Sequence, residues 1–233
     1  MLKLTNVSYK VDDKDILIDI NLTINDGESV VITGHNGSGK STLIKLIMGI
    51  INPTSGKIEL DGEDITYMPI YERAKRGLTI AFQQPVRFKG LTVKNLIDTA
   101  TSHTNNVGDV CEYLSRVGLC AKNYINRELD DTLSGGELKR IEIAMAIAKG
   151  GEVYLFDEPE AGIDLWSFEE LTTVFGALKD KTRIIVSHQE KVIQTADRIV
   201  VLSGGRVDRE GKTEDIMKDL QTARTCGKLG GDK

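Results

Sequence analysis

One Gly-rich loop constrains the fold of this chain more than any other feature of its sequence. Gly34-His35-Asn36-Gly37-Ser38-Gly39-Lys40-Ser41 fits the pattern GxxxxGK[ST]. It follows Ser29–Thr33, a short apolar run typical of a strand buried in a parallel sheet. It precedes residues 43–51, whose leucines and isoleucines recur at i, i+3, i+4 and i+7 of a helix. The sequence therefore predicts a strand–loop–helix unit, and a purely structural turn would need neither Lys40 nor Ser41.

The chemistry of this phosphate loop (Gly34–Ser41) is that of a triphosphate site. Its glycines let successive backbone N–H groups point at phosphate oxygens, and the helix N-terminus adds positive potential. Lys40 would neutralise the β- and γ-phosphates, and the Ser41 hydroxyl would ligate Mg²⁺. We therefore predict that a nucleotide is bound by Gly34, His35, Asn36, Gly37, Ser38, Gly39, Lys40, Ser41 and Thr42.

Two carboxylates follow a second apolar strand, Val153–Phe156. At the strand tip, Asp157 can hold Mg²⁺ through water beside Ser41. Glu158, one residue on, can polarise a water for in-line attack on the γ-phosphate. Taken alone, this pattern would indicate a strand end that meets a solvated turn. Because the same chain carries a phosphate loop, the catalytic interpretation is favoured.

Residues Leu133–Glu137, Leu-Ser-Gly-Gly-Glu, predict the start of a helix. By itself the segment is typical of a capping box, with Ser134 as N-cap and Glu137 three residues later. Two glycines at a helix N-terminus also form a possible second anion site. Both interpretations remain open from these residues alone.

The order of hydrophobic patterns predicts an α/β fold with a parallel sheet. The first thirty residues alternate as strands do, and strands then alternate with helices. The β-pattern disappears over residues 86–130, which predict an inserted helical subdomain between core segments 1–85 and 131–221. In the helix expected over Glu137–Lys149, the apolar residues Ile141, Ala144, Met145 and Ala148 share one face. Residues 222–233 form a polar tail.

Composition excludes several classes. The formal net charge of −5 argues against a nucleic-acid binder, which usually presents a basic face. The longest apolar run covers about nine residues, whereas a spanning helix needs ~20, so we expect no direct membrane insertion. Three cysteines without a CxxC pair favour a reducing cytoplasm over a disulfide framework. Cys111 is expected to be buried, in a helical stripe with Val110 and Leu114.

With these motifs in hand, almost the whole chain, from Tyr9 to about Leu220, resembles the nucleotide-binding subunits of the ATP-binding-cassette (ABC) superfamily. The matching positions, in chain order, are Tyr9, the phosphate loop, Gln83, the signature segment (Leu133–Glu137), Asp157-Glu158, Asp164 and His188. The resemblance implies one cassette over residues 1–233. Its core would be a P-loop, RecA-like ATPase core with an N-terminal antiparallel β region and a helical insert.

The resemblance also implies a role for each matching residue. Tyr9 would stack on adenine, and Gln83 would touch Mg²⁺ and the attacking water, although its neighbour Gln84 remains an alternative. Glu158 would promote hydrolysis and His188 would hold the γ-phosphate. Ser134, Gly135 and Gly136 would contact the γ-phosphate of ATP bound to a second subunit, and Asp164 would lie at that contact. The implied machine is an ATP-dependent homodimer that uses ATP and Mg²⁺.

Two partner classes remain. Gly135–Ile143 (Gly-Gly-Glu-Leu-Lys-Arg-Ile-Glu-Ile) and Phe82–Val86 resemble the SufC-type ATPases of the SUF iron–sulfur assembly system, which implies a SufB/SufD-like scaffold as partner. Glu158-Pro159 and Leu165–Phe168 depart from that pattern. The alternative is the motor subunit of a membrane transporter. The expected contact with the partner lies in Pro85–Leu91, where Phe88 and Leu91 either reach the partner or pack within the helical insert.

Overall fold

A computed structural model describes residues 1–163 and 165–219. The elements in chain order are β1 (Leu2–Val11), β2 (Lys14–Ile24), β3 (Ser29–Gly34), α1 (Lys40–Met48), β4 (Ser55–Leu60), β5 (Glu63–Asp64), α2 (Ile70–Lys75), β6 (Leu78–Ala81), β7 (Phe88–Thr92), α3 (Val93–Thr101), α4 (Val107–Arg116), α5 (Ala121–Tyr124), β8 (Glu128–Leu129), α6 (Gly135–Lys149), β9 (Val153–Asp157), α7 (Leu165–Ala177), β10 (Thr182–Val186), α8 (Glu190–Ile193), β11 (Arg198–Ser203) and β12 (Arg206–Lys212). Residues 213–219 are helical.

Two sheets form the frame of the molecule. Strands β2, β1, β4 and β5 form an antiparallel sheet in that order, which confirms the antiparallel N-terminal region that the resemblance implies. The larger sheet has the order β12-β11-β3-β10-β9-β6, and all its neighbours run parallel except β12, which returns antiparallel to β11. The predicted α/β class with a parallel sheet is therefore confirmed.

The hydrophobic core lies on both faces of the larger sheet. Successive residues of a strand point to opposite faces, so Val31 joins one core cluster while Val30 and Ile32 join the other. The cluster of Val30 and Ile32 also contains the buried residues of α1 and of the N-terminal sheet. Burial on both faces explains why β3 is a continuous apolar run rather than an alternating one.

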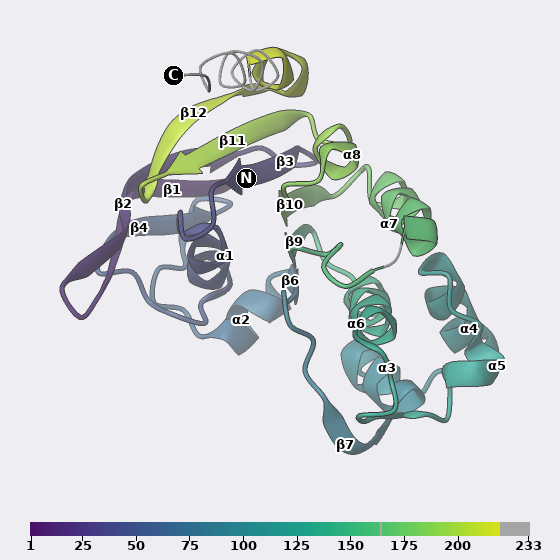
Figure 1. Ribbon diagram of the computed structural model, residues 1–233. Coiled ribbons are helices and arrows are strands. Elements are labelled where there is room, and N and C mark those ends of the chain that lie inside the picture. The colour runs from purple at the N-terminus through teal and green to yellow at the C-terminus, as the bar shows by residue number, and fades with distance from the viewer. Residues whose placement is uncertain (164, 220–233) are drawn as a thin grey trace.

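Helices α3, α4, α5 and α6 gather at the end of the molecule away from the four-stranded sheet (Figure 1). Helix α6 packs against both α3 and α4 and also against β6. The short strands β7 and β8 pair with each other beside these helices. The sequence pattern did not predict β7, because its residues are mostly exposed and therefore do not alternate between buried and exposed.

The expectation that Cys111 is buried is wrong. Helix α4 buries Val110 and Leu114, and Cys111, one residue beyond Val110, lies about 100° away on the exposed side. Cys120 is exposed as well, and both are free thiols.

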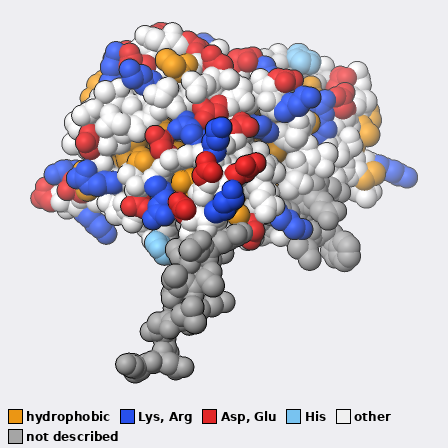
Figure 2. Space-filling model, turned by 90° about the horizontal axis from the view of Figure 1, so that it is seen from above, with side chains coloured by type: hydrophobic (Ala, Val, Ile, Leu, Met, Phe, Trp, Pro, Cys, Tyr) orange, Lys and Arg blue, Asp and Glu red, His pale blue; other side chains and the backbone are white. Residues whose placement is uncertain are grey.

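The surface above β11 and β12 carries basic and acidic side chains that are interspersed with each other (Figure 2). Within residues 1–163 and 165–219, no helix is both long and apolar enough to cross a lipid bilayer.

Candidate active site

The carboxyl ends of four neighbouring parallel strands bring the predicted residues together. The phosphate loop follows β3, His188 follows β10, Glu158 follows β9 and Gln83 follows β6. Open parallel sheets bind ligands at this edge, where the loops after adjacent strands converge. Residues as far apart in sequence as Gly34 and His188, 154 positions, thus lie along one edge of one sheet.

The phosphate loop joins β3 to α1 and lines a cleft of about 420 Å³. We call this hollow the nucleotide cleft; it is lined by Lys14, Ile16, Asn36, Gly37, Gly39, Lys40, Ser41, Thr42, Gln83 and Glu158. The Lys40 ammonium donates hydrogen bonds to the carbonyl oxygens of Gly34 (2.9 Å) and His35 (3.0 Å). An ammonium has three donors, so one remains to reach a phosphate.

Gly34 is required for the loop to pass close to β11. A Cβ atom at this position would lie 2.1 Å from the carbonyl oxygen of Leu202, and the backbone has φ of +144°. Any side chain would therefore push the loop away from the sheet. Among the described residues, the buried hydroxyl of Ser38 in the same loop has no hydrogen-bond partner. A buried polar atom of this kind fits a loop that is completed by a phosphate ligand.

Ser41 and Asp157 form a pair of oxygen ligands at the base of the cleft. The Ser41 hydroxyl donates a 3.0 Å hydrogen bond to Oδ1 of Asp157, which is buried. Burial raises the pKa of Asp157, and the neighbouring Glu158 charge raises it further. Within the described part of the chain, no three His, Cys, Asp or Glu side chains cluster as metal ligands. One hydroxyl and one carboxylate fit Mg²⁺, which takes few protein oxygens beside water and phosphate.

Gln83 and Glu158 meet at the far side of the cleft. The Gln83 amide Nε2 donates a 2.7 Å hydrogen bond to Glu158 Oε2. Strands β6 and β9 pair in parallel with Ala81 opposite Phe156, so two residues further on Gln83 falls opposite Glu158. Glu158 has φ of +45°, in the left-handed region that few non-glycine residues adopt. Of the two glutamines left open by the sequence, Gln83 is the one that contacts Glu158.

His188 lies on the other side of the phosphate loop. It is exposed and lines a separate cavity of about 900 Å³ together with His35, Asn36, Asp208 and Arg209. The residue before it, Ser187, is buried and hydrogen-bonded to the buried carboxyl of Glu160. This contact ties the loop after β9 to the loop after β10. The phosphate loop is therefore flanked by two hollows, with Glu158 in one and His188 in the other.

The signature segment lies at the start of α6, away from the nucleotide cleft of the same chain. None of the signature residues belongs to the described lining of that cleft. The capping box is present: the Ser134 hydroxyl accepts from the Glu137 N–H at 3.2 Å, and Glu137 Oε2 accepts from the Ser134 N–H at 2.7 Å. At Gly136 an added Cβ would lie 2.7 Å from the Gly162 carbonyl oxygen, whereas Gly135 faces open space.

The predicted adenine-stacking residue, Tyr9, does not belong to the described lining of the cleft. Tyr9 is half-buried on β1 opposite Leu17 of β2 and packs against the core, while Lys14 and Ile16 of β2 line the cleft instead. Its stacking on adenine stays a prediction. Asp164 lies outside the described residues, as does the predicted tail 222–233.

Sequence reasoning assigned no structural role to two charged residues that bind the backbone directly before Gln83 and Glu158. Lys139 and Glu142 are on α6 at positions i and i+3, with side chains 0% and 15% exposed. Burial lowers the pKa of the Lys139 ammonium and raises the pKa of the Glu142 carboxyl. The sequence signal that could have revealed the pair is a lysine and a glutamate three positions apart inside a largely apolar helix.

Comparisons with known proteins agree with this geometry. The family model described as "ABC transporter" matches residues 17–161. An uncharacterized ABC transporter ATP-binding protein of Methanocaldococcus jannaschii is 37% identical, over 98% of this chain and 94% of that protein. The lipopolysaccharide export system ATP-binding protein LptB of Haemophilus influenzae is 30% identical, over 96% and 95%. The energy-coupling factor transporter ATP-binding protein EcfA2 of Clostridium perfringens is 33% identical, over 92% and 79%.

Solved structures share the fold. A dimeric ATP-binding cassette in a post-hydrolysis state, bound to ADP and Pi, superposes with a TM-score of 0.82 at 28% identity, over 91% of this chain and 99% of that chain. A bacterial Atm1-family ABC exporter with ATP bound gives a TM-score of 0.83 at 26% identity, over all of this chain and 42% of that one.

Proposed function

Because this chain belongs to the ABC transporter family of ATP-binding proteins and is an ATPase of that family, we propose that it is the motor subunit of a membrane transporter. ATP binds in the nucleotide cleft, two copies of the chain close on it, and hydrolysis reopens them. The opening and closing move a membrane partner. The ATP-binding relatives described above support this proposal, because their names place them in transport systems.

The observation that carries the hydrolytic part of the proposal is the 2.7 Å hydrogen bond between Gln83 and Glu158 at the wall of the cleft that contains the phosphate loop. A general base must lie within hydrogen-bond reach of the water that it activates. Gln83 fixes one carboxylate oxygen of Glu158, which leaves the other free to accept a proton from water. The exposed His188 lies across the loop and is placed to hold the γ-phosphate.

Mg²⁺, when bound, would neutralise charge on the phosphates, with Ser41 and Asp157 as its protein ligands and Gln83 nearby. The chain's own contribution is to keep these oxygens 3.0 Å apart at the strand tip and to keep the Asp157 carboxylate out of bulk water. The Lys40 ammonium orients the β- and γ-phosphates from the opposite side.

The separation of the signature segment from the nucleotide cleft within one chain supports dimer formation. Ser134, Gly135 and Gly136 lie at the N-terminus of α6, a place that favours an anion, and the described lining of the nucleotide cleft includes none of them. In a head-to-tail dimer they would contact the γ-phosphate in the cleft of the second copy. The similar cassette bound to ADP and Pi is described as dimeric, which supports this arrangement.

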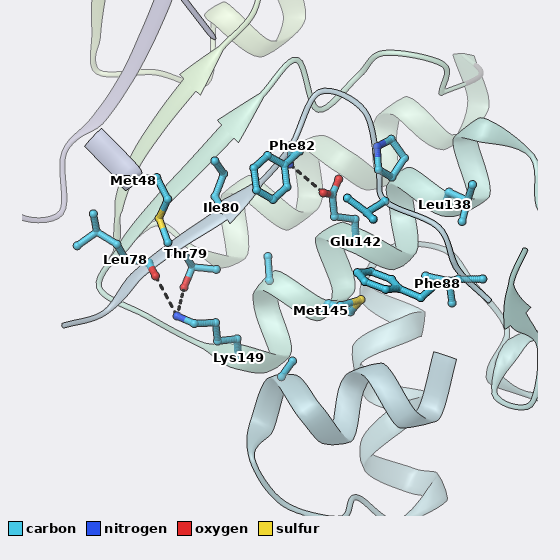
Figure 3. Close-up of a pocket in the computed structure, with 15 residues that line it drawn as sticks. Met48, Leu78, Thr79, Ile80, Phe82, Phe88, Leu138, Glu142, Met145 and Lys149 are labelled. Atoms are coloured by element: carbon cyan, nitrogen blue, oxygen red, sulfur yellow. Dashed lines mark hydrogen bonds between the residues drawn. The ribbon is translucent and has the colours of Figure 1, made fainter. Parts of the chain in front are cut away.

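The proposed contact with the partner is an apolar pocket of about 220 Å³ beside α6 (Figure 3). We call it the α6 pocket; its lining includes Ile80, Phe82, Phe88, Leu138, Glu142 and Met145. Phe88 packs into this pocket while 39% exposed, and Val86 at its rim is 52% exposed. An apolar side chain from a cytoplasmic segment of the membrane subunit would fill it, in agreement with the contact expected over Pro85–Leu91.

A second candidate is the iron–sulfur assembly role with a SufB/SufD-like partner. It is favoured by one observation, the Gly135–Ile143 sequence with its Lys139 and Glu142, which resembles SufC-type ATPases. None of the relatives described above carries a name that refers to iron–sulfur assembly, so we place transport first.

Hydrolysis is tested with Glu158→Gln. We expect phosphate release from ATP and Mg²⁺ to fall at least about 100-fold, because the base is lost. The affinity for a fluorescent ATP analogue should stay within about threefold of that of the unchanged protein, because the phosphate loop is intact. Undiminished turnover in this variant would refute the assignment of Glu158.

The partner is identified by purifying the native complex from the source cell in mild detergent, with Phe88→Asp as the matched control. An integral membrane protein that is captured by the unchanged chain and lost with Phe88→Asp supports the transporter role. A soluble protein that binds an iron–sulfur cluster and is lost in the same way supports the assembly role and rejects transport.

A further inference from the structure

Two buried charges of α6 hold the main chain immediately before each member of the Gln83–Glu158 pair. The Lys139 ammonium donates hydrogen bonds to the carbonyl oxygen of Phe82 and, at 3.3 Å, to that of Asp157. Glu142 Oε1 accepts from the Phe82 N–H at 2.9 Å (Figure 3). Both backbone groups of Phe82 are thus bound to one helix, and the same ammonium spans the ends of β6 and β9.

We propose that Lys139 and Glu142 are positioning residues for ATP hydrolysis, which set the distance and orientation of Gln83 relative to Glu158. Neither residue belongs to the described lining of the nucleotide cleft, and they act through the backbone of Phe82 and Asp157. This inference rests on the proposed catalytic role of Glu158. The signature segment begins α6. The inference therefore gives two residues of this helix a role in the active site of their own subunit.

Stability alone does not account for the pair. Taking both charges out of water is expensive, and buried ion pairs replaced by apolar side chains of similar size often leave a protein equally or more stable. The pair is also an imperfect ion pair, because Lys139 Nζ lies 3.6 Å from Glu142 Oε2. Its best contacts are instead with the backbone at Phe82, where a shift of the order of 1 Å would reach the catalytic atoms.

The position of the pair also links the α6 pocket to the active site. Phe82 and Glu142 both line that pocket, and the next residue along the chain is Gln83. A partner side chain that fills the pocket therefore presses on the residues that hold Gln83. Any displacement of α6 would move Phe82 and Asp157 together, because the Lys139 ammonium is bound to the carbonyl oxygens of both.

The test compares two variants of one position. Glu142→Leu removes the acceptor of the Phe82 N–H, and Glu142→Gln keeps an acceptor oxygen without the charge. We expect kcat for ATP hydrolysis to fall at least about tenfold in Glu142→Leu, with KM for ATP within about threefold, because misplacement by about 1 Å affects the reacting geometry more than ground-state binding. Glu142→Gln should recover kcat to within about threefold of that of the unchanged protein.

The matched control is Arg183→Met, at the start of β10. Arg183 is buried, and its guanidinium donates a hydrogen bond to the carbonyl oxygen of Phe175 on α7. Its replacement removes a buried cation that binds a main-chain carbonyl, as Lys139 does, at a strand end remote from Gln83. We expect kcat to stay within about twofold.

Hydrogen exchange gives a readout that needs no turnover. In Glu142→Leu the amides of Phe82 and Gln83 should exchange at least about tenfold faster, while those of β10 exchange as before, because only the local hydrogen bond is lost. Unchanged exchange at Phe82 would overturn the inference. If instead Glu158→Gln retained full activity, the catalytic assignment would fail, whatever the exchange result.

The double variant Lys139→Met/Glu142→Leu separates positioning from stability. Its thermal midpoint should lie above that of Lys139→Met alone, because no uncompensated charge remains buried. Its kcat should nevertheless remain at least about tenfold low. A folded double variant with kcat at the original level would show that the pair does not position Gln83 and Glu158, and would overturn the inference.

Discussion

The side-chain amide of Gln83 donates a 2.7 Å hydrogen bond to Oε2 of Glu158, across 75 positions of sequence. The parallel pairing of β6 with β9 produces this contact, because Ala81 lies opposite Phe156 and each strand ends shortly afterwards. The hydrogen bond fixes a carboxylate beside the phosphate loop. It therefore connects the fold directly to the proposed chemistry.

Removing this hydrogen bond should slow hydrolysis without weakening ATP binding. In Gln83→Ala the Glu158 carboxylate loses its fixed orientation, and we expect kcat to fall about 10- to 100-fold. The dissociation constant for ATP should change less than about threefold, because Lys40 and the loop N–H groups are untouched. Steady-state phosphate release and equilibrium titration with a fluorescent ATP analogue measure the two quantities.

Gln84→Ala is the matched control for that prediction, since it removes the same side chain one position on, where it does not contact Glu158. We expect kcat within about twofold of that of the unchanged protein. Equal losses in the two variants would contradict the assignment of Gln83 as the residue that orients Glu158.

The two glycines of the signature segment should respond differently to a single methyl group. Gly136→Ala places Cβ 2.7 Å from the Gly162 carbonyl oxygen, so the loop before Asp164 must shift. We expect a loss of about 1–3 kcal/mol, or roughly 2–10 °C in Tm. Gly135→Ala meets open space and adds helix propensity, so its Tm should be unchanged or up to about 4 °C higher. Calorimetry that found the same Tm for both variants would refute this packing.

The capping box should make stability depend on pH in the acid range. Hydrogen bonds from the Tyr124 hydroxyl and the Ser134 N–H lower the pKa of Glu137 to about 2 from its ordinary 4.5. A lowered native pKa gives stabilisation that is complete above about pH 4.5 and is lost as the pH falls toward 2. Glu137→Gln should therefore cost about 1 kcal/mol at pH 7.

The same experiment repeated at lower pH checks the sign of that effect. The difference in unfolding free energy between Glu137→Gln and the unchanged protein should shrink between pH 4.5 and 2, as measured by urea titration. A difference that stays constant over that range would mean that the Glu137 charge does not contribute.

Local patterns in the sequence were sufficient to predict the phosphate loop, the buried strands and the capped start of α6. Each of these depends on residues within about ten positions of one another, where period and capping rules act. The alternation of the first thirty residues likewise predicted strands, and their antiparallel arrangement came only from the resemblance. The strand β7 was missed because its residues are mostly exposed and its partner β8 lies about 40 residues away.

The site required information that no local pattern contains. That Gln83 rather than Gln84 contacts Glu158 depends on β6 being the neighbour of β9, which is a property of strand order. The sequence analysis considered only one apolar face of α6 and gave Lys139 and Glu142 no structural role. Contacts with α3, α4 and β6 surround this helix, so Lys139 is fully buried and the Glu142 side chain is only 15% exposed.

The central claim, that two copies of this chain close on ATP and that Glu158 hydrolyses it, is tested most directly by the molar mass of Glu158→Gln in solution. Light scattering on the size-exclusion eluate would be recorded with ATP and Mg²⁺, and again with ADP and Mg²⁺. We predict about twice the mass of the 25.6 kDa chain with ATP and a single chain with ADP, because the variant binds ATP but cannot cleave it. A single-chain mass under both conditions, at ATP concentrations that saturate the cleft, would contradict the account.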